Sequence, residues 1–146
     1  MKAAVLYEAH QPLVIEEISV RKPAAHEVLL RTAVAGLCHS DLHFIEGIFP
    51  HPLPVVLGHE SAGIVEQVGS EVSYVKPGDH VVTCLSVFCG TCENCITGHP
   101  NLCLDTDVKM PPGKAKRLEW GKPEQLHTFV NLSSFCILYT SPSPRD

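Results

Sequence analysis

Four cysteines close together in the middle of the chain constrain its fold more than any other feature. They follow the spacing C-x2-C-x2-C-x7-C and are Cys89, Cys92, Cys95 and Cys103. Thiolates at this density normally share one metal ion, because C-x2-C turns let successive sulfurs converge on one centre. A zinc ion bound by four cysteines is closed and structural, with no open position for a substrate. The cluster therefore predicts a zinc-stapled lobe, and chemistry must be sought elsewhere in the chain.

Two other uses of a four-cysteine cluster fit this sequence less well. The bacterial ferredoxin pattern for an iron–sulfur cluster ends in C-x3-C-P, whereas here the last gap is seven residues and Leu104 follows Cys103. A zinc ribbon that binds nucleic acid is disfavoured by the formal net charge of −5, with acidic and basic residues dispersed along the chain. We therefore expect no nucleic-acid partner.

Length and composition limit what the whole chain can be. Its 146 residues are one domain's worth, enough to bury a core without disulfides. No apolar run approaches ~18 residues and the N-terminus lacks a signal-peptide core, so no membrane segment is expected. The lack of a signal peptide indicates a reducing compartment. In such a compartment the seven cysteines serve as metal ligands and free thiols. We therefore expect a cytoplasmic protein.

Short strand-like segments separated by turn residues predict a mainly β barrel or sandwich. These segments are residues 3–8, 13–20, 27–36, the second half of 58–69, 75–84 and 124–130. A short helix is expected over residues 41–46, capped by Ser40 or Asp41 and ended by Gly47. No G-x-G-x-x-G motif occurs, so we expect no Rossmann dinucleotide-binding domain within the chain.

Two stretches are expected at the surface. Residues 104–124 are polar and contain Pro and Gly, which predicts a long surface loop with Lys114, Lys116 and Arg117 as a solvated basic cluster. Residues 140–146 are polar and Pro-rich, which predicts disorder.

Two further groups of residues can supply chemistry, namely residues 38–43 (CHSDLH) and 58–60 (GHE). Each group stands where a strand-like segment meets a loop. The thiolate of Cys38 and the imidazole of His59 suit a catalytic zinc, which takes three protein ligands and leaves a fourth position open. Asp41 can accept a hydrogen bond from the other ring nitrogen of His59 and fix its tautomer. Ser40 and His43 offer a hydroxyl and an imidazole for moving a proton from a buried site to solvent.

Each of these residues also has a simpler interpretation when taken alone. A lone cysteine or histidine is more often a buried core group than a ligand. Ser40 and Asp41 can act only as helix caps, and His43 can be a solvated helix histidine.

The motifs together resemble the zinc-dependent medium-chain alcohol dehydrogenases. Four of them stand in the order and spacing of that family: residues 36–43 (GLCHSDLH), 58–63 (GHESAG), 77–81 (PGDHV) and the four-cysteine loop. The separation of Cys38 and His59 by 21 positions (59 − 38) also fits. The resemblance covers residues 1–135 and implies the N-terminal catalytic domain of that family. That domain is a GroES-like, partly open β-barrel with a zinc-binding lobe and short helices.

The resemblance assigns metal ligands at two sites. Cys38 and His59 resemble two ligands of the catalytic zinc, and Glu60 the carboxylate that approaches the metal during ligand exchange. Asp41 resembles the partner that orients the ring of His59. The structural zinc site corresponds to Cys89, Cys92, Cys95 and Cys103.

The resemblance also implies which residues handle the proton and the cofactor. Ser40 resembles the hydroxyl that hydrogen-bonds the substrate alcohol, and His43 the next member of the proton relay. His39 occupies the position that contacts the cofactor pyrophosphate. The implied activity is oxidation of a small-molecule alcohol to an aldehyde or ketone with NAD or NADP, through zinc-alkoxide formation and hydride transfer. Full-length relatives are expected to be homo-oligomers.

Two rival functions remain from the sequence. One is a non-catalytic, zinc-stapled GroES-like interaction module. The other is a zinc-lacking quinone reductase relative, which Cys38, His59 and the four-cysteine loop disfavour.

The C-terminal part of the sequence departs from the family. The third catalytic ligand of the family is a cysteine that would fall beyond Asp146, and Cys136, 77 positions after His59 (136 − 59), matches no family motif. Residues 136–146 are expected to be an unrelated, disordered tail. The sequence therefore predicts a truncated and inactive fragment.

Overall fold

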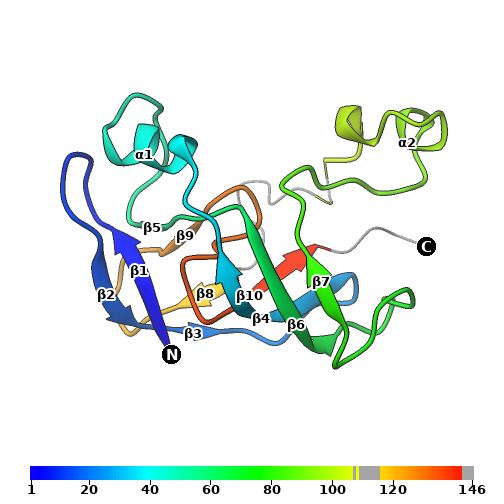
Figure 1. Ribbon diagram of the computed structural model, residues 1–146, viewed down its shortest axis with the longest axis horizontal. Coiled ribbons are helices and arrows are strands. Elements are labelled where there is room, and N and C mark those ends of the chain that lie inside the picture. The colour runs from blue at the N-terminus through cyan, green and yellow to red at the C-terminus, as the bar shows by residue number, and fades with distance from the viewer. Residues whose placement is uncertain (107, 109–115, 143–146) are drawn as a thin grey trace.

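The computed structural model describes residues 1–106, 108 and 116–142. Its strands form two four-stranded sheets and one two-stranded sheet (Figure 1). The first sheet has the order β2-β1-β5-β9, with β1 (Lys2–Leu6), β2 (Val14–Glu17), β5 (Val55–Val56) and β9 (His127–Thr128). The second has the order β10-β4-β6-β7, with β4 (Glu27–Ala35), β6 (Ser61–Val68), β7 (His80–Val82) and β10 (Leu138–Pro142). The third pairs β3 (Ser19–Val20) with β8 (Leu118–Glu119).

The prediction of a mainly β fold with a cysteine lobe and short helices is confirmed. The helices are α1 (His39–Ile45), α2 (Glu93–Ile96) and a 3-10 turn, η1 (Pro100–Leu102). Among the described strands only β5 and β9 pair in parallel, so this part of the chain holds no Rossmann-type parallel sheet. No helix among the described residues is long and apolar enough to cross a bilayer.

Strand β4 corresponds to the strand expected from the sequence over residues 27–36. Strands β4 and β6 form the centre of the second sheet. Their antiparallel pairing shifts register between Thr32 and Val34, where the sheet bends. A Cβ on Gly63 would lie 2.5 Å from the carbonyl oxygen of Arg31, so the close approach of the two strands requires glycine there. The pairing brings the end of β4 beside the start of β6.

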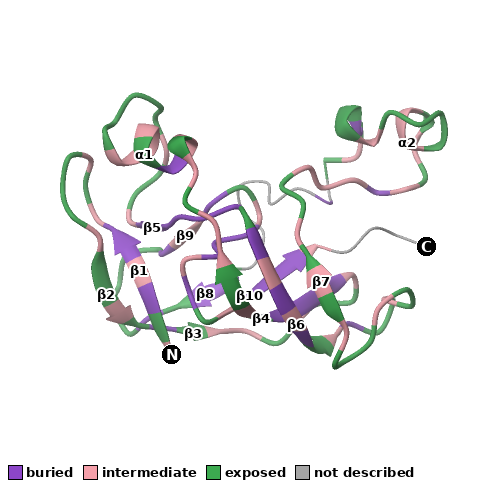
Figure 2. Cartoon of the chain, in the orientation of Figure 1, coloured by how far each residue is buried: buried purple, intermediate pink, exposed green. Residues whose placement is uncertain are grey.

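The core lies between the sheets, where the buried faces of β1, β4, β5, β6 and β10 meet (Figure 2). Its main cluster contains Val28, Leu30, Val65, Trp120 and Tyr139. Burial of such apolar side chains contributes most of the folding free energy, at about 25 cal/mol per Å².

Helix α1 begins two residues earlier than the sequence predicted. Its N-cap is Cys38, whose backbone N–H donates to Asp41 Oδ2 at 3.3 Å, so Asp41 acts from inside the first turn. The expected end at Gly47 is confirmed, because the helix stops at Ile45 and Gly47 adopts a positive φ of 67°.

The prediction of a solvated surface loop over residues 104–124 is wrong for residues 117–120. The side chain of Arg117 is 4% exposed, and its Nε lies 2.9 Å from Oε1 of the buried Glu27. Leu118 and Trp120 are buried in the core. This segment enters the core because β8 pairs with β3, a partner about 100 residues away whose position no local pattern signals. Lys116 is exposed as expected, and Lys114 lies outside the described residues.

The prediction of a disordered tail over residues 136–146 is wrong for residues 136–142. Residues Leu138–Pro142 form β10, which pairs along β4. Tyr139 is 1% exposed, and its hydroxyl lies 2.5 Å from Ser61 Oγ. The segment from Cys136 to Thr140 is apolar and strand-prone, so it can cover the edge that β4 would otherwise leave open. Residues 143–146 lie outside the described part of the chain.

Candidate metal centres

The four-cysteine lobe projects from the barrel beside β7 (Figure 1). Cys92 precedes α2 and Cys103 follows η1, so two short helical turns bring the four thiols together. Their sulfurs all lie within 4.8 Å of one another. The Sγ–Sγ distances are 3.4 Å for Cys92–Cys95 and 3.9 Å for both Cys89–Cys95 and Cys92–Cys103. Tetrahedral zinc with Zn–S bonds of about 2.3 Å needs sulfurs about 3.8 Å apart, so the cluster fits this ion.

Backbone N–H groups in the lobe point at sulfur and favour its anionic form. Those of Thr91 and Cys92 lie 3.4 and 3.2 Å from Cys89 Sγ, and the N–H of Cys89 lies 3.3 Å from Cys103 Sγ. The N–H of Thr91 is the main reason that the pKa of Cys89 falls to about 6. Burial raises the pKa of Cys95 to about 12, so this thiol needs a cation to ionise it.

A second cluster of ligand atoms joins Cys38, His59 and Glu60. Their sulfur, ring nitrogen and carboxylate oxygen all lie within 4.8 Å of one another. Cys38 stands between β4 and α1, while His59 and Glu60 come just before β6, so the β4–β6 pairing brings the two segments together. A thiol, an imidazole and a carboxylate are all zinc ligands, and this set leaves room for a fourth.

Two glycines make the second cluster possible. The N–H of Gly36 donates to the carbonyl oxygen of Glu60 at 2.9 Å, and any side chain on Gly36 would collide with the Glu60 carboxylate. Gly58 has a positive φ of 90°, and a Cβ there would lie 2.5 Å from the ring of Phe135. Both positions therefore require glycine if His59 and Glu60 are to face Cys38.

The carboxylate of Asp41 contacts three groups around the second cluster. Its Oδ1 lies 3.3 Å from His59 Nδ1 and accepts the N–H of Gly58 at 3.0 Å, while its Oδ2 accepts the N–H of Cys38 at 3.3 Å. Because Nδ1 of His59 faces this carboxylate, Nε2 is the nitrogen left for a metal. The structure thus brings together the two residues that the sequence suggested as partners.

The remaining residues singled out in the sequence lie on α1. Ser40 Oγ is 3.6 Å from Cys38 Sγ, so the hydroxyl lies beside the metal-ligand cluster. The rings of His39 and His43 are in edge contact, with centroids 4.8 Å apart. His39 is exposed and His43 is half-buried.

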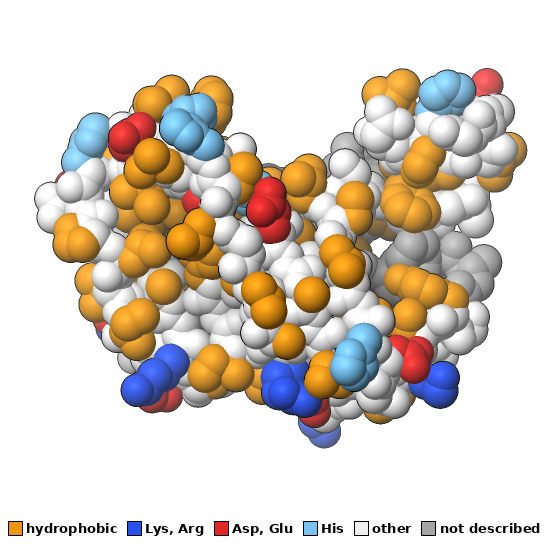
Figure 3. Space-filling model, in the orientation of Figure 1, with side chains coloured by type: hydrophobic (Ala, Val, Ile, Leu, Met, Phe, Trp, Pro, Cys, Tyr) orange, Lys and Arg blue, Asp and Glu red, His pale blue; other side chains and the backbone are white. Residues whose placement is uncertain are grey.

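A hollow of about 550 Å³ opens over the second cluster. One of the segments that line it was not predicted from the sequence. His59 and Glu60 line it together with Thr83–Ser86, which follow β7. Cys84 within this segment is exposed and lies past the end of β7. No motif marks these residues; only the pairing of β7 with β6 places them here. In Figure 3 the molecule is hollowed between the projections that carry α1 and α2.

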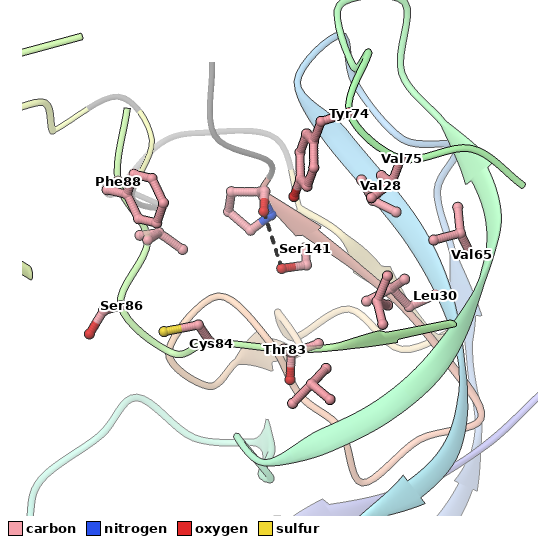
Figure 4. Close-up of a pocket in the computed structure, with 14 residues that line it drawn as sticks. Val28, Leu30, Val65, Tyr74, Val75, Thr83, Cys84, Ser86, Phe88 and Ser141 are labelled. Atoms are coloured by element: carbon pink, nitrogen blue, oxygen red, sulfur yellow. Dashed lines mark hydrogen bonds between the residues drawn. The ribbon is translucent and has the colours of Figure 1, made fainter. Parts of the chain in front are cut away.

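An apolar cavity of about 270 Å³ adjoins this hollow and shares Thr83, Cys84 and Ser86 with it (Figure 4). Leu30, Val65 and Val75 line one side, and the segment carrying Cys84 and Phe88 lies across from Tyr74. It contains none of the residues expected to bind metal, substrate or cofactor.

The structure combines a GroES-like barrel, a four-thiol lobe and a separate thiol–imidazole–carboxylate cluster. This combination defines a class of zinc-binding catalytic domain. Comparison with known proteins agrees with this class. Residues 24–127 match the alcohol dehydrogenase GroES-like domain. The chain therefore belongs to the zinc-dependent medium-chain alcohol dehydrogenase family, as the sequence motifs indicated.

Solved structures of this family superpose on almost the whole chain. An alcohol dehydrogenase zinc-binding domain protein from Burkholderia ambifaria is 38% identical, with a TM-score of 0.86 over 97% of this chain and 39% of that one. Benzyl alcohol dehydrogenase from Acinetobacter calcoaceticus is 32% identical, with a TM-score of 0.83 over 97% and 38%. Alcohol dehydrogenase TADH from Thermus sp. ATN1 is 30% identical, with a TM-score of 0.71 over 97% and 37%. The chain thus spans less than two-fifths of the length of these proteins.

Proposed function

We propose that this chain supplies the zinc-holding, alcohol-binding part of an NAD(P)-dependent alcohol dehydrogenase. The observation that carries the proposal is the convergence of Cys38, His59 and Glu60 within 4.8 Å, with the carboxylate of Asp41 against the far side of the imidazole. A thiolate and an imidazole beside an open position are typical of catalytic zinc, whereas closed four-thiol sites are structural. The four-cysteine lobe takes the structural role.

In this proposal Cys38 and His59 would hold the catalytic zinc, Glu60 would approach it during ligand exchange, and Asp41 keeps Nε2 of His59 directed at it. Bound zinc would supply the Lewis acidity that makes an alcohol proton easier to remove, and a bound nicotinamide would supply the hydride acceptor. Ser40 takes the proton from the alcohol, and its position beside Cys38 supports that role. His43 passes the proton on to solvent.

The other parts of the proposal rest on family membership. His39 contacts the pyrophosphate of NAD or NADP. The substrate is a small-molecule alcohol, or an aldehyde in the reverse direction, and the complete protein is a homo-oligomer. We propose a cytoplasmic location because all seven cysteines are free thiols in the structure, which suits a reducing compartment.

Cobalt binding tests the second metal centre directly. Titration with Co²⁺ should give thiolate charge-transfer bands for two sites, of which the second binds more weakly because it has one thiolate. Cys38→Ser and His59→Gln should each remove the second site and keep the first. Cys84→Ser, which changes an exposed thiol outside both clusters, is the control. A single Co²⁺ per chain, unaffected by Cys38→Ser, would support the non-catalytic interaction module instead.

Activity is tested in a chimera in which residues 1–135 of this chain replace the matching part of the Burkholderia ambifaria protein. We expect NAD(P)-dependent alcohol oxidation, followed by the absorbance of the reduced cofactor, and its loss in Cys38→Ser and Ser40→Ala chimeras. A folded chimera that binds zinc at both centres and oxidises no alcohol would refute the proposal.

A further inference from the structure

The turn that follows β9, residues 129–134, packs against His59 from a part of the chain that carries no metal-ligand motif. Phe129 is 2% exposed, and its ring meets the His59 ring edge to face, with centroids 5.6 Å apart and an interplanar angle of 70°. Aromatic rings prefer this arrangement because the positive edge of one ring meets the negative face of the other. The His59 ring is therefore held by Phe129 as well as by the carboxylate of Asp41 at Nδ1.

The same turn binds the backbone on both sides of His59. The N–H groups of Ser133 and Ser134 donate to the carbonyl oxygen of Gly58 at 3.1 and 3.0 Å. The hydroxyl of Ser134 donates to the carbonyl oxygen of Glu60 at 3.3 Å. Both serines are buried, so solvent does not compete for these hydrogen bonds. One short segment thus fixes the residue before His59 and the residue after it.

The backbone of the turn is strained. Val130, Asn131 and Ser133 have positive φ angles of 40°, 63° and 82°, although none of them is glycine. A β-branched residue rarely adopts a positive φ, and such strain persists only where surrounding contacts impose it. Here the N–H of Phe129 donates to Ser133 Oγ at 2.9 Å, and the hydrogen bonds to Gly58 hold the end of the turn. Strained backbone of this kind is concentrated at functional sites, where it keeps a group in one orientation.

We propose that the 129–134 turn positions His59 for metal binding, with Phe129 acting on the imidazole and Ser134 on the backbone. A phenyl ring has no ligand atom, and the Ser134 hydroxyl is directed at Glu60, so both residues act through His59. A ring that is already oriented loses less conformational freedom when it binds an ion, so the turn raises the affinity of the second cluster. This inference rests on the proposed function, because it concerns the same metal centre.

Co²⁺ titration of the chain whose four-cysteine lobe already holds zinc tests the proposal, because the added ion then reports on the second cluster alone. Phe129→Leu should weaken Co²⁺ binding about 3–10-fold, as expected for the loss of an aromatic pair, and should shift the visible bands of the bound ion. Ser134→Ala keeps the ring and removes the hydrogen bond to Glu60, and should weaken binding about 2–5-fold. This second variant keeps the test decisive if Phe129→Leu does not fold.

Leu6→Ala is the matched control, because Leu6 lies on β1 in the same buried apolar cluster as Phe129. It should lower the thermal midpoint at least as much as Phe129→Leu and keep the wild-type Co²⁺ affinity. A second measurement needs no ion in the second cluster. The imidazole ¹H–¹³C signals of His59, assigned by their loss in His59→Gln, should move toward those of a free histidine in Phe129→Leu and stay in place in Leu6→Ala.

The outcomes separate this inference from the proposed function. Absence of a second Co²⁺ in the wild type would overturn the proposed function and, with it, the role of the turn. Wild-type binding as expected, with unchanged affinity in both Phe129→Leu and Ser134→Ala, would overturn the inference alone. Equal losses of affinity in Phe129→Leu and Leu6→Ala would also overturn it, because they would trace the effect to general loss of packing.

Discussion

Asp41 Oδ1 lies 3.3 Å from Nδ1 of His59, and the two residues are only 3% and 6% exposed. The same carboxylate accepts the backbone N–H groups of Cys38 and Gly58. One buried side chain therefore ties the start of α1 to the loop before β6, and these two segments carry the candidate ligands. Positioning of the ligands and capping of the helix depend on the same carboxylate.

We predict that Asp41→Asn weakens metal binding at Cys38 and His59 by 10–100-fold, the usual effect of losing the partner behind a ligating histidine. The amide is nearly isosteric but lacks the charge that orients the His59 ring. Co²⁺ titration gives the affinity of this site. Asp79→Asn is the control, because Asp79 lies in a surface turn and pairs with Lys76. Equal losses in the two variants would show that Asp41 has no specific part in metal binding.

We predict that Cys95→Ser loses the firmly bound zinc and destabilises the lobe. Structural zinc stabilises folding by ~10–16 kcal/mol (apparent) in finger peptides, and three thiolates hold it far less well. Zinc content per chain and the thermal midpoint measure the effect. The exposed Cys84→Ser should change neither quantity. Unchanged zinc content and melting in Cys95→Ser would rule out the structural zinc site.

We predict that Arg117→Met costs about 1.5–3 kcal/mol of stability, because it removes a charge-assisted hydrogen bond to the buried carboxylate of Glu27, which keeps only Arg21 and the N–H of Ala24. Arg31→Met removes an exposed pair with Glu66 and should cost at most about 1 kcal/mol. Urea unfolding of the three proteins gives these differences. Similar midpoints for the two variants would mean that the Arg117–Glu27 pair is as solvated as a surface pair.

The same ion pair predicts how stability depends on pH. Burial raises the pKa of Glu27, but the backbone N–H of Ala24 and the charge of Arg117 outweigh burial, so the folded-state pKa lies below the usual value. A depressed pKa adds stability above the unfolded-state pKa, and this stability is lost as pH falls through the folded-state pKa. Glu27→Gln should therefore flatten the acid limb of the stability profile. An acid limb as steep as that of the wild type would assign the dependence to other carboxyls.

We predict that Tyr139→Ala costs about 3–5 kcal/mol, because a large side chain leaves the core and opens a cavity. Tyr139→Phe keeps the ring but removes the hydrogen bond to Ser61 Oγ, and should cost about 1 kcal/mol. Tyr74→Ala, at a ring that is 58% exposed, is the control. If Tyr139→Ala melts like Tyr74→Ala, β10 does not pack into the barrel in solution.

The ligands of the four-thiol site could be read from the sequence because local turns determine them, and those of the second cluster because they lie in family motifs. The C-x2-C spacings around Cys92 place sulfurs on one side of short turns whatever the rest of the fold does. The strand over residues 27–36 was equally clear, since β-branched and apolar residues predominate from Val28 to Ala35, between Pro23 and Gly36. The start of α1 was missed because a cysteine, which is not a usual cap, takes the N-cap position.

The residues around the site were harder to predict. Thr83–Ser86 reach the hollow over His59 only because β7 pairs with β6. The polar, Pro-containing composition of residues 104–124 predicted a solvated loop. Arg117 instead pairs with the buried carboxylate of Glu27, 90 positions away. The Pro-rich end of the chain suggested disorder, but the apolar residues before it complete the sheet beside β4.

The sequence by itself determined the chemical identity of the four-thiol centre, because C-x2-C spacing is a local property, and indicated the second centre only through the family motifs that carry Cys38 and His59. Tertiary structure decided what surrounds them: the carboxylate behind His59, the hollow above Glu60, and the burial of Arg117 and Tyr139. Those relationships join residues 18, 78 and 90 positions apart. Contacts at such separations leave no periodic pattern in the sequence, since they arise only when the sheets pair and the core closes.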